Sequence, residues 1–194
     1  MTEINKLVLR SVKEILHEKQ IILILDSVDM CGKTEVANKL NDLLGLPVYK
    51  NSKEQSMWQD KLISLIYGQE ELTQFLEKTG YSVIFDRFHA SEYVYSKVFK
   101  RISHDGVVMD IDKRLATLNC LIIYPWKNSN KYLADDQGIV KIEQYDSLKK
   151  HYEEFFNKTK CDVIRYNADD EDLGKQMNII LQAIFGMFNE VKIE

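Results

Sequence analysis

The sequence predicts an α/β protein of three layers, with a central parallel sheet of about five strands and helices on both faces. Two observations predict this class. Short apolar runs alternate along the 194 residues with longer segments whose apolar residues recur at helical spacing. Such alternation is typical of parallel sheets with helical crossover connections. Ligands bind such sheets at the carboxyl ends of the strands, so the residues that follow each apolar run are the functional candidates.

Five apolar runs predict the strands, in an order that alternates with the helices. The third is followed at once by Asp86 and Arg87, and the fourth, Cys-Leu-Ile-Ile-Tyr, is the strongest. The expected strands cover residues 21–25, 47–49, 81–86, 120–124 and 163–166.

Stripes of apolar residues three and four positions apart predict the helices. Gly45 and Pro47 end the helix that follows the first strand, and Gly80 ends the helix before the third. The expected helices cover residues 4–16, 33–44, 58–66, 70–78, 94–102, 110–117, 142–156 and 173–188.

The segment after the first strand predicts a phosphate-binding loop. Residues 27–34 read Ser-Val-Asp-Met-Cys-Gly-Lys-Thr. The phosphate-loop motif is Gly, four free positions and Gly-Lys-Ser/Thr; its backbone N–H groups cradle phosphates, its Lys reaches the β- and γ-phosphates and its hydroxyl binds Mg²⁺. Only the first Gly is replaced here, by Ser27. The helix after the loop directs its free N–H groups and positive dipole end at an anion bound there.

Asp86 and Arg87 form a second candidate constellation at the end of the third predicted strand. A guanidinium group suits phosphate oxygens, and a carboxylate can hold Mg²⁺ or accept a proton from an attacking hydroxyl. A structural Asp–Arg pair would have the same sequence, but the phosphate loop upstream favours the functional interpretation.

Net charge, cysteine content and the lengths of apolar runs limit the functions and locations that the sequence favours. A formal net charge of −4 gives no support for binding nucleic acid by charge alone. The three cysteines are far apart, with no Cys-x-x-Cys motif and no His at ligand spacing. No run approaches the length of a membrane span and no signal segment opens the chain. We therefore expect one cytoplasmic domain over residues 1–194, with small-molecule nucleotide substrates and no membrane partner, and composition does not favour a nucleic-acid partner.

The two motifs together resemble the thymidylate kinase-like group of P-loop nucleoside and nucleotide kinases, whose three-layer P-loop NTPase fold the chain is then expected to share. In that group the loop often reads Glu-Gly-x-Asp-x-x-Gly-Lys-Ser/Thr. Residues 26–34 follow this pattern with Asp26 for Glu and Ser27 for Gly. The group's Asp-Arg-Tyr motif, with a Ser shortly after, is similar to residues 86–91.

The resemblance implies roles for single residues, with ATP and Mg²⁺ as cofactors. Arg87 would hold the acceptor phosphate, and Asp29 would contact the deoxyribose hydroxyl or organise the acceptor. The catalytic residues would be Lys33, Asp86 and Arg87, and Thr34 with Asp86 would hold the metal ion. The phosphates of ATP would bind Asp29, Met30, Cys31, Gly32, Lys33 and Thr34. The acceptor would bind Asp29, Lys50, Arg87, Phe88 and Tyr93, the aromatic residues forming walls for the base.

The sequence also departs from the group. Lys50 stands where an Arg is common, and residues 127–141, the expected lid, offer Lys127 and Lys131 in place of arginines. Divergent, short members of this kind resemble the nucleotide kinases of large phages. The resemblance further implies a homodimer.

The function that these features favour is ATP-dependent phosphoryl transfer to a deoxynucleoside monophosphate. A deoxynucleoside kinase is the first alternative, and Lys50 argues against it because that branch generally carries a Glu there. A nucleotide-binding P-loop protein without kinase activity, or a kinase acting on modified bases in DNA, remains a further alternative.

Overall fold

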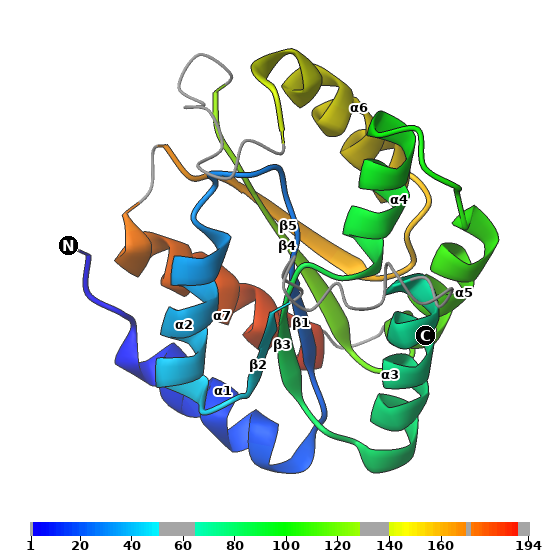
Figure 1. Ribbon diagram of the computed structural model, residues 1–194. Coiled ribbons are helices and arrows are strands. Elements are labelled where there is room, and N and C mark those ends of the chain that lie inside the picture. Colours follow the sequence, from blue (N-terminus) through cyan, green and yellow to red (C-terminus); the bar gives the residue numbers. More distant parts are fainter. Residues whose placement is uncertain (1, 51–64, 129–139, 170–171, 190–194) are drawn as a thin grey trace.

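The computed structural model describes residues 2–50, 65–128, 140–169 and 172–189. Its centre is a five-stranded, all-parallel sheet in the order β2-β3-β1-β4-β5 (Figure 1), which confirms the predicted class. The strands are β1 (Ile22–Leu25), β2 (Val48–Lys50), β3 (Val83–Asp86), β4 (Cys120–Trp126) and β5 (Asp162–Asn167).

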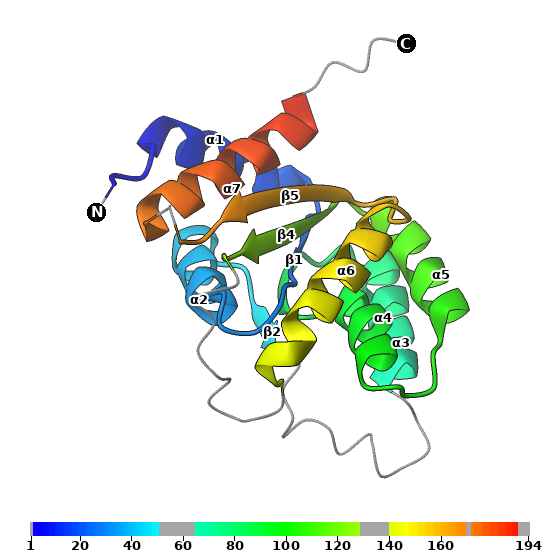
Figure 2. The ribbon, with the colours of Figure 1, turned by 90° about the horizontal axis from the view of Figure 1, so that it is seen from above.

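Helices cover both faces of the sheet. Figure 2 shows α1, α2 and α7 on one face and α3, α4, α5 and α6 on the other. The central strand, β1, contributes side chains to the core on both faces of the sheet. Ile22 and Ile24 belong to one core cluster, and Leu23 and Leu25 belong to the other. The helices are α1 (Lys6–Glu18), α2 (Lys33–Leu44), α3 (Leu65–Thr79), α4 (His89–Val98), α5 (Asp105–Ala116), α6 (Tyr145–Phe156) and α7 (Leu173–Asn189), with the 3₁₀ turn η3 (Ile142–Gln144) before α6.

Three helices have boundaries that differ by about four residues or more from those expected. The helix expected at 70–78 begins at Leu65 and passes through Gly68, and the one expected at 110–117 begins at Asp105 and passes through Gly106. An internal glycine weakens a helix by only about 1 kcal/mol, which tertiary packing outweighs. The helix expected at 94–102 covers His89–Val98 instead, and Ile102 is exposed. The helix expected at 58–66 lies almost entirely outside the described residues.

Strand β4 continues two residues beyond the expected 124, through Pro125. A proline has no N–H to give to a ladder, so it is tolerated where one side of a strand has no partner. The pairing of β1 with β4 stops at Ile123, whereas β5 continues beside β4 to Trp126. Pro125 therefore lies beyond the reach of β1.

The register of the sheet gathers the predicted functional segments at one edge. Asp86 at the end of β3 pairs with Leu25 on one side and with Lys50 on the other. The phosphate loop leaves β1 at this same level, so the carboxyl ends of three strands converge there.

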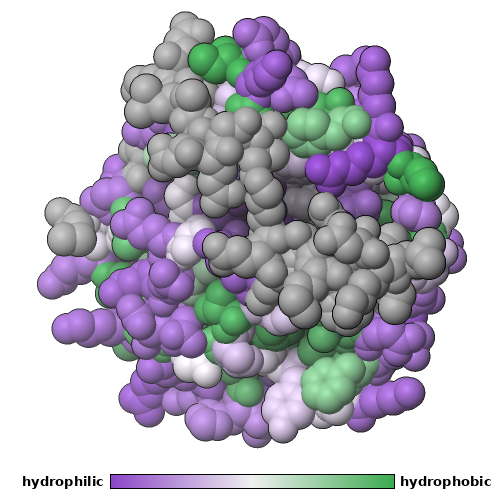
Figure 3. All heavy atoms as spheres, viewed as in Figure 1, coloured by the Kyte–Doolittle hydropathy of each residue, from purple (hydrophilic) through white to green (hydrophobic). Residues whose placement is uncertain are grey.

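The described surface is predominantly polar. On the face shown in Figure 3, hydrophilic side chains predominate and apolar ones occur in small groups. None of the described helices is long and apolar enough to span a bilayer.

Candidate functional site

The phosphate loop is built around two left-handed residues. Met30 and Gly32 have φ angles of 62° and 76°. A Cβ at Gly32 would meet no atom within 4 Å, so glycine is favoured there by its backbone conformation rather than by space. Ser27, which replaces the first motif glycine, is not among the described residues with positive φ. The loop therefore accepts serine at this position without left-handed strain.

Lys33, the first residue of α2, folds back over the loop. Its Nζ atom donates to the Val28 carbonyl at 2.7 Å and to the Ser27 hydroxyl at 3.3 Å. Burial is the main cause that lowers the pKa of Lys33, to about 8, and the neighbouring charge of Arg87 lowers it further. The ammonium group is thus held among loop carbonyl and hydroxyl oxygens at the helix N-terminus, where an anion is favoured.

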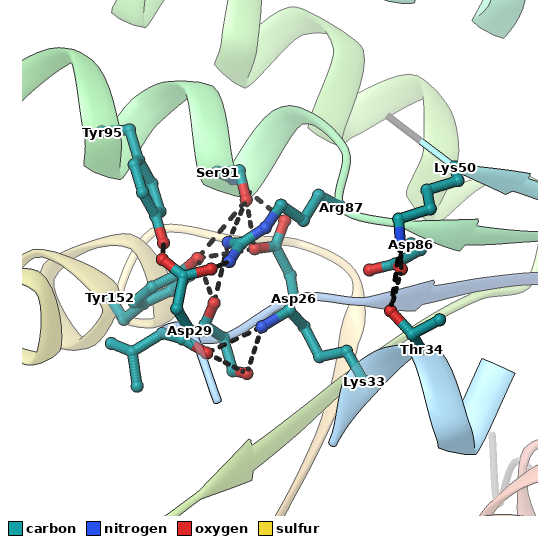
Figure 4. Close-up of polar contacts among 12 residues, drawn as sticks. Asp26, Asp29, Lys33, Thr34, Lys50, Asp86, Arg87, Ser91, Tyr95 and Tyr152 are labelled. Atoms are coloured by element: carbon teal, nitrogen blue, oxygen red, sulfur yellow. Dashed lines mark hydrogen bonds and ion pairs between the residues drawn. The ribbon is translucent and has the colours of Figure 1, made fainter. Parts of the chain in front are cut away.

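Thr34 and Asp86 meet beside this lysine. The Thr34 hydroxyl is on an exposed residue and donates to Asp86 Oδ2 at 2.8 Å. Lys50 Nζ lies 3.5 Å from the Thr34 hydroxyl and 4.0 Å from the Asp86 carboxylate. The first turn of α2 and the ends of β3 and β2 therefore place a hydroxyl, a carboxylate and an ammonium group together (Figure 4).

Arg87 turns away from its strand towards the loop. Its φ of 70° is a left-handed conformation that costs a non-glycine residue about 1–3 kcal/mol and is concentrated at functional sites. The guanidinium group donates to the Ser27 carbonyl at 2.9 Å and forms an ion pair with Asp29. Tyr95 of α4 supports this pair: its hydroxyl donates to Asp29 at 2.8 Å, and its ring lies 4.9 Å from the guanidinium carbon.

The charges and hydrogen bonds around Asp29 and Tyr95 shift the pKa values of both side chains. Burial alone would raise the pKa of Asp29, but the charges of Arg87 and Lys33 and the hydroxyl of Tyr95 outweigh it, and the net shift is downward. Burial, together with the Asp29 charge, raises the pKa of Tyr95, so that hydroxyl remains a donor.

Asp26 is a fully buried carboxylate that the sequence offered only as a substitute for the group's Glu. Its Oδ2 atom accepts the backbone N–H groups of Phe88 and Ser91, at 3.2 and 2.9 Å, and so caps the N-terminus of α4 from the end of β1. Its Oδ1 atom accepts the hydroxyls of Ser91 at 2.5 Å and Tyr152 at 2.6 Å. Four donors therefore satisfy one carboxylate.

Tyr152 brings α6 into this network. Besides Asp26, its hydroxyl contacts the Ser27 carbonyl at 3.2 Å. The residue comes from a helix more than a hundred positions after the loop, and its spacing in the sequence indicated only a core face. No sequence pattern marks it as a contact of the phosphate loop.

The comparisons with known proteins concern the fold. No protein-family model matches the sequence, and comparison with curated proteins finds no relative. Among solved structures, YorR of Bacillus subtilis, in complex with phosphorylated GDP, superposes with a TM-score of 0.68 at 19% identity, covering 87% of this chain and 98% of YorR. Deoxyadenosine kinase of M. mycoides matches at 0.55 and 16%, with 86% and 99% covered. Thymidylate kinase of Candida albicans matches at 0.53 and 16%, with 87% and 93% covered.

The fold is that of the P-loop kinases. Polyphosphate kinase 2 of Arthrobacter aurescens shares it too, with a TM-score of 0.63 at 14% identity over 93% of this chain and 76% of that one. The P-loop kinase fold therefore accounts for the strand order and for the position of the loop at the end of the central strand.

Within this P-loop kinase fold, several predicted residues lie together and others do not. The loop, Lys50, Asp86 and Arg87 converge, as described above. Phe88 is fully buried and stacks on Phe85 with centroids 4.1 Å apart, and Tyr93 is 1% exposed and accepts a hydrogen bond from Lys158. The structure thus places both aromatic residues in the core and does not bring them to the site surface. Phe88 precedes α4 as its N-cap residue and Tyr93 lies on the buried face of that helix, and one sequence does not fix either direction.

Two further predicted residues belong to the lid. Lys127, which follows β4, is half-buried, and its carbonyl accepts a hydrogen bond from Lys149 at 3.2 Å. Lys131 lies outside the described residues. Cys31 of the loop is buried at 1% exposure, which suits a small residue inside a turn.

Proposed function

We propose that this protein transfers the γ-phosphoryl group of ATP to a deoxynucleoside monophosphate. One observation carries the proposal: the Thr34 hydroxyl and the Asp86 carboxylate lie 2.8 Å apart beside a phosphate loop that Arg87 also contacts. Phosphoryl transfer is catalysed mainly by positioning and charge neutralisation, and these are the groups that supply both.

ATP binds through the loop in this proposal. The loop amides and the first turn of α2 receive the phosphates. Lys33 exchanges its contact with the Val28 carbonyl for a phosphate oxygen, which keeps the ammonium group in the same place. Because the loop already holds this side chain folded inward, little rotamer freedom is lost on binding.

The chemistry of the donor set fits Mg²⁺. The Thr34 hydroxyl and the Asp86 carboxylate supply oxygen ligands, which this hard cation prefers, and their oxygens are already adjacent. These two residues would hold the ion. When bound, Mg²⁺ neutralises charge on the transferring phosphate.

The acceptor lies towards the ends of β2 and β3. Lys50, whose side chain is 54% exposed, offers a cation at the end of β2, and Arg87 offers a second one. Two cations support a monophosphate acceptor. Structures of the same fold hold related nucleotides: YorR holds phosphorylated GDP, and the M. mycoides deoxyadenosine kinase holds the products dCMP and dCDP.

A deoxynucleoside acceptor is the second candidate. The guanidinium of Arg87 is already engaged by Asp29, the Ser27 carbonyl and Ser91. Asp86 supplies a carboxylate at the same edge that could take the proton of a 5′-hydroxyl. A panel of nucleosides and monophosphates, assayed for ADP formation, separates the two.

The kinase proposal is tested by replacing the loop lysine. Lys33→Ala is expected to lower ADP formation at least about a hundredfold, the scale of losing one transition-state donor. Lys39→Ala, six residues further along α2, is the matched control and should retain activity. Full activity in Lys33→Ala contradicts the proposal. Tight ATP binding with no ADP formed on any deoxynucleotide or DNA substrate identifies a binding protein instead.

A further inference from the structure

A second polar cluster lies inside the layer formed by α3, α4, α5 and α6. His89 opens α4, Asp112 lies in the middle of α5, and Cys161 directly precedes β5. One ligand atom from each residue lies within 4.8 Å of those of the other two. The three residues are 0%, 0% and 7% exposed. Asp112 lies 23 positions after His89, and Cys161 lies 49 positions after Asp112. No motif of short spacing therefore indicates the cluster.

The side chains of His89, Asp112 and Cys161 offer donor atoms that bind transition-metal ions. An imidazole nitrogen, a carboxylate oxygen and a thiol sulfur together suit Zn²⁺, whereas Mg²⁺ and Ca²⁺ prefer oxygen alone. His89 Nε2 and Asp112 Oδ1 are 3.1 Å apart. Two such ligands on a tetrahedral Zn²⁺, each at about 2.0 Å from the ion, are about 3.3 Å apart. The pair therefore needs almost no rearrangement to share one ion.

A second thiol, that of Cys120, lies beside Cys161. Cys120 opens β4, and its neighbour Leu121 pairs with Asp162, the residue after Cys161. The two cysteines thus lie side by side on adjacent strands and face the same core cluster. Cys161 Sγ donates to the backbone carbonyl of Asp112 at 3.5 Å.

The surroundings orient the ligands. Asp112 Oδ2 accepts the backbone N–H of Lys160 at 2.7 Å, and Oδ1 accepts the hydroxyl of Thr159 at 2.5 Å. Metal-binding carboxylates are commonly held by such outer hydrogen bonds. The other ring nitrogen of His89, Nδ1, has no hydrogen-bond partner in the described part of the chain, so the polar contact of the ring is directed at Asp112.

We propose that His89, Asp112, Cys161 and Cys120 form a structural Zn²⁺ site. Binding displaces the thiol protons of the two cysteines, and the remaining proton of the imidazole resides on Nδ1. The site joins α4, α5 and the amino ends of β4 and β5. Since His89 is only two residues from Arg87 and from Ser91, the ion fixes the helix start that also reaches the phosphate loop.

Two measurements on the full chain test the site. We expect the purified protein to retain about one equivalent of zinc, and the zinc-free protein to bind one Co²⁺ with thiolate-to-cobalt charge-transfer absorption. Zinc at about a hundred times its Kd should raise the melting temperature by at least about 5 °C. Absence of both the bound zinc and the cobalt spectrum overturns the proposal.

Matched variants locate the ion. Cys161→Ser and His89→Asn should each weaken Co²⁺ binding at least about a hundredfold, and Thr159→Val, which removes an outer hydrogen bond, about tenfold. Cys31→Ser removes the third buried thiol, outside the cluster, and should bind Co²⁺ as the wild type does. Equal binding by Cys161→Ser and the wild type overturns the assignment. If a variant fails to fold, the zinc-dependent melting shift of the wild type still decides.

Discussion

At the residue scale, the depressed pKa of Lys33 predicts how nucleotide affinity depends on pH. Burial and the charge of Arg87 lower this pKa to about 8, and bound phosphates favour the protonated amine. Below pH 8 the free protein already carries the charge, so affinity is flat. Above it, binding must also take up a proton, and affinity falls by up to about tenfold per pH unit. Titrations with a non-hydrolysable ATP analogue measure this slope.

Lys33→Arg is the control for that slope. An arginine remains protonated across the range, so the variant should bind more weakly overall but without the decline that begins near pH 8. A decline of equal steepness in both proteins contradicts the assignment of the slope to Lys33.

Asp29 supports a second prediction at this scale. Its carboxylate and the guanidinium of Arg87 have side chains only 23% and 17% exposed, so Asp29→Asn leaves a poorly solvated charge and should cost about 1–3 kcal/mol of unfolding free energy. Tyr95→Phe removes one hydrogen bond to Asp29 and should cost about 1 kcal/mol. Urea unfolding measures both.

The pH dependence of Asp29→Asn distinguishes charge from packing. The pKa of Asp29 is lowered in the folded protein, so its stabilisation is complete above the ordinary value of 3.8 and is lost as pH falls through the folded value. The difference between wild type and variant should therefore shrink below about pH 4. A difference that is independent of pH indicates a packing effect.

The sequence could offer as site candidates those residues that belong to short contiguous motifs. Lys33 and Thr34 close the phosphate-loop motif that follows β1, Asp86 and Arg87 lie at the end of β3, and parallel strands bring these carboxyl ends together. Tyr95 and Tyr152 reach the site from the faces of helices. For them, as for the buried Phe88, the direction of the side chain depends on helix packing that one sequence does not fix.

At the element scale, α4 depends on a cap from another element. Phe88, its N-cap residue, makes no side-chain capping bond, and Asp26 supplies the acceptor instead. The tertiary cap explains why the helix begins directly after Arg87, although no Ser, Thr, Asn or Asp stands at its N-cap position. Local sequence could predict that a helix follows β3, but not what fixes its first turn.

Tyr152→Phe tests the connection between α6 and this cap. The variant removes the hydroxyl that donates to Asp26 and contacts the Ser27 carbonyl, and should cost about 1.5–3 kcal/mol as a hydrogen bond to a charged group. If Tyr152 positions the loop, kcat should fall about tenfold with little change in KM. Tyr166→Phe is the control, because its hydroxyl makes a 3.3 Å contact with Gln176 in the opposite layer. Equal kinetics in the two variants contradict a positioning role.

At the scale of the whole molecule, the fold class followed from the sequence because amphipathic helices separate each apolar strand from the next. The assignment of helices to the two faces required the structure, since strand order decides which crossover lies on which face. The sheet places β3 between β1 and β2, and this order brings Lys50 beside Asp86. The positions of Lys50, Asp86 and Thr34 in the sequence do not by themselves show that the three side chains lie together.

Shifts of the melting temperature on ligand binding distinguish the ATP-binding part of the proposed site from the acceptor-binding part. A ligand that binds only the folded state raises the melting temperature according to its affinity, so ATP analogue and monophosphate are each expected to shift it. Lys33→Ala should lose the ATP shift and keep the monophosphate shift, and Lys50→Ala the reverse. Because the Lys50 side chain is 54% exposed, its replacement should leave the melting temperature of the unliganded protein almost unchanged. Loss of the monophosphate shift in Lys50→Ala then indicates that Lys50 contacts the acceptor. Equal shifts with nucleosides and monophosphates would instead assign the acceptor as a nucleoside.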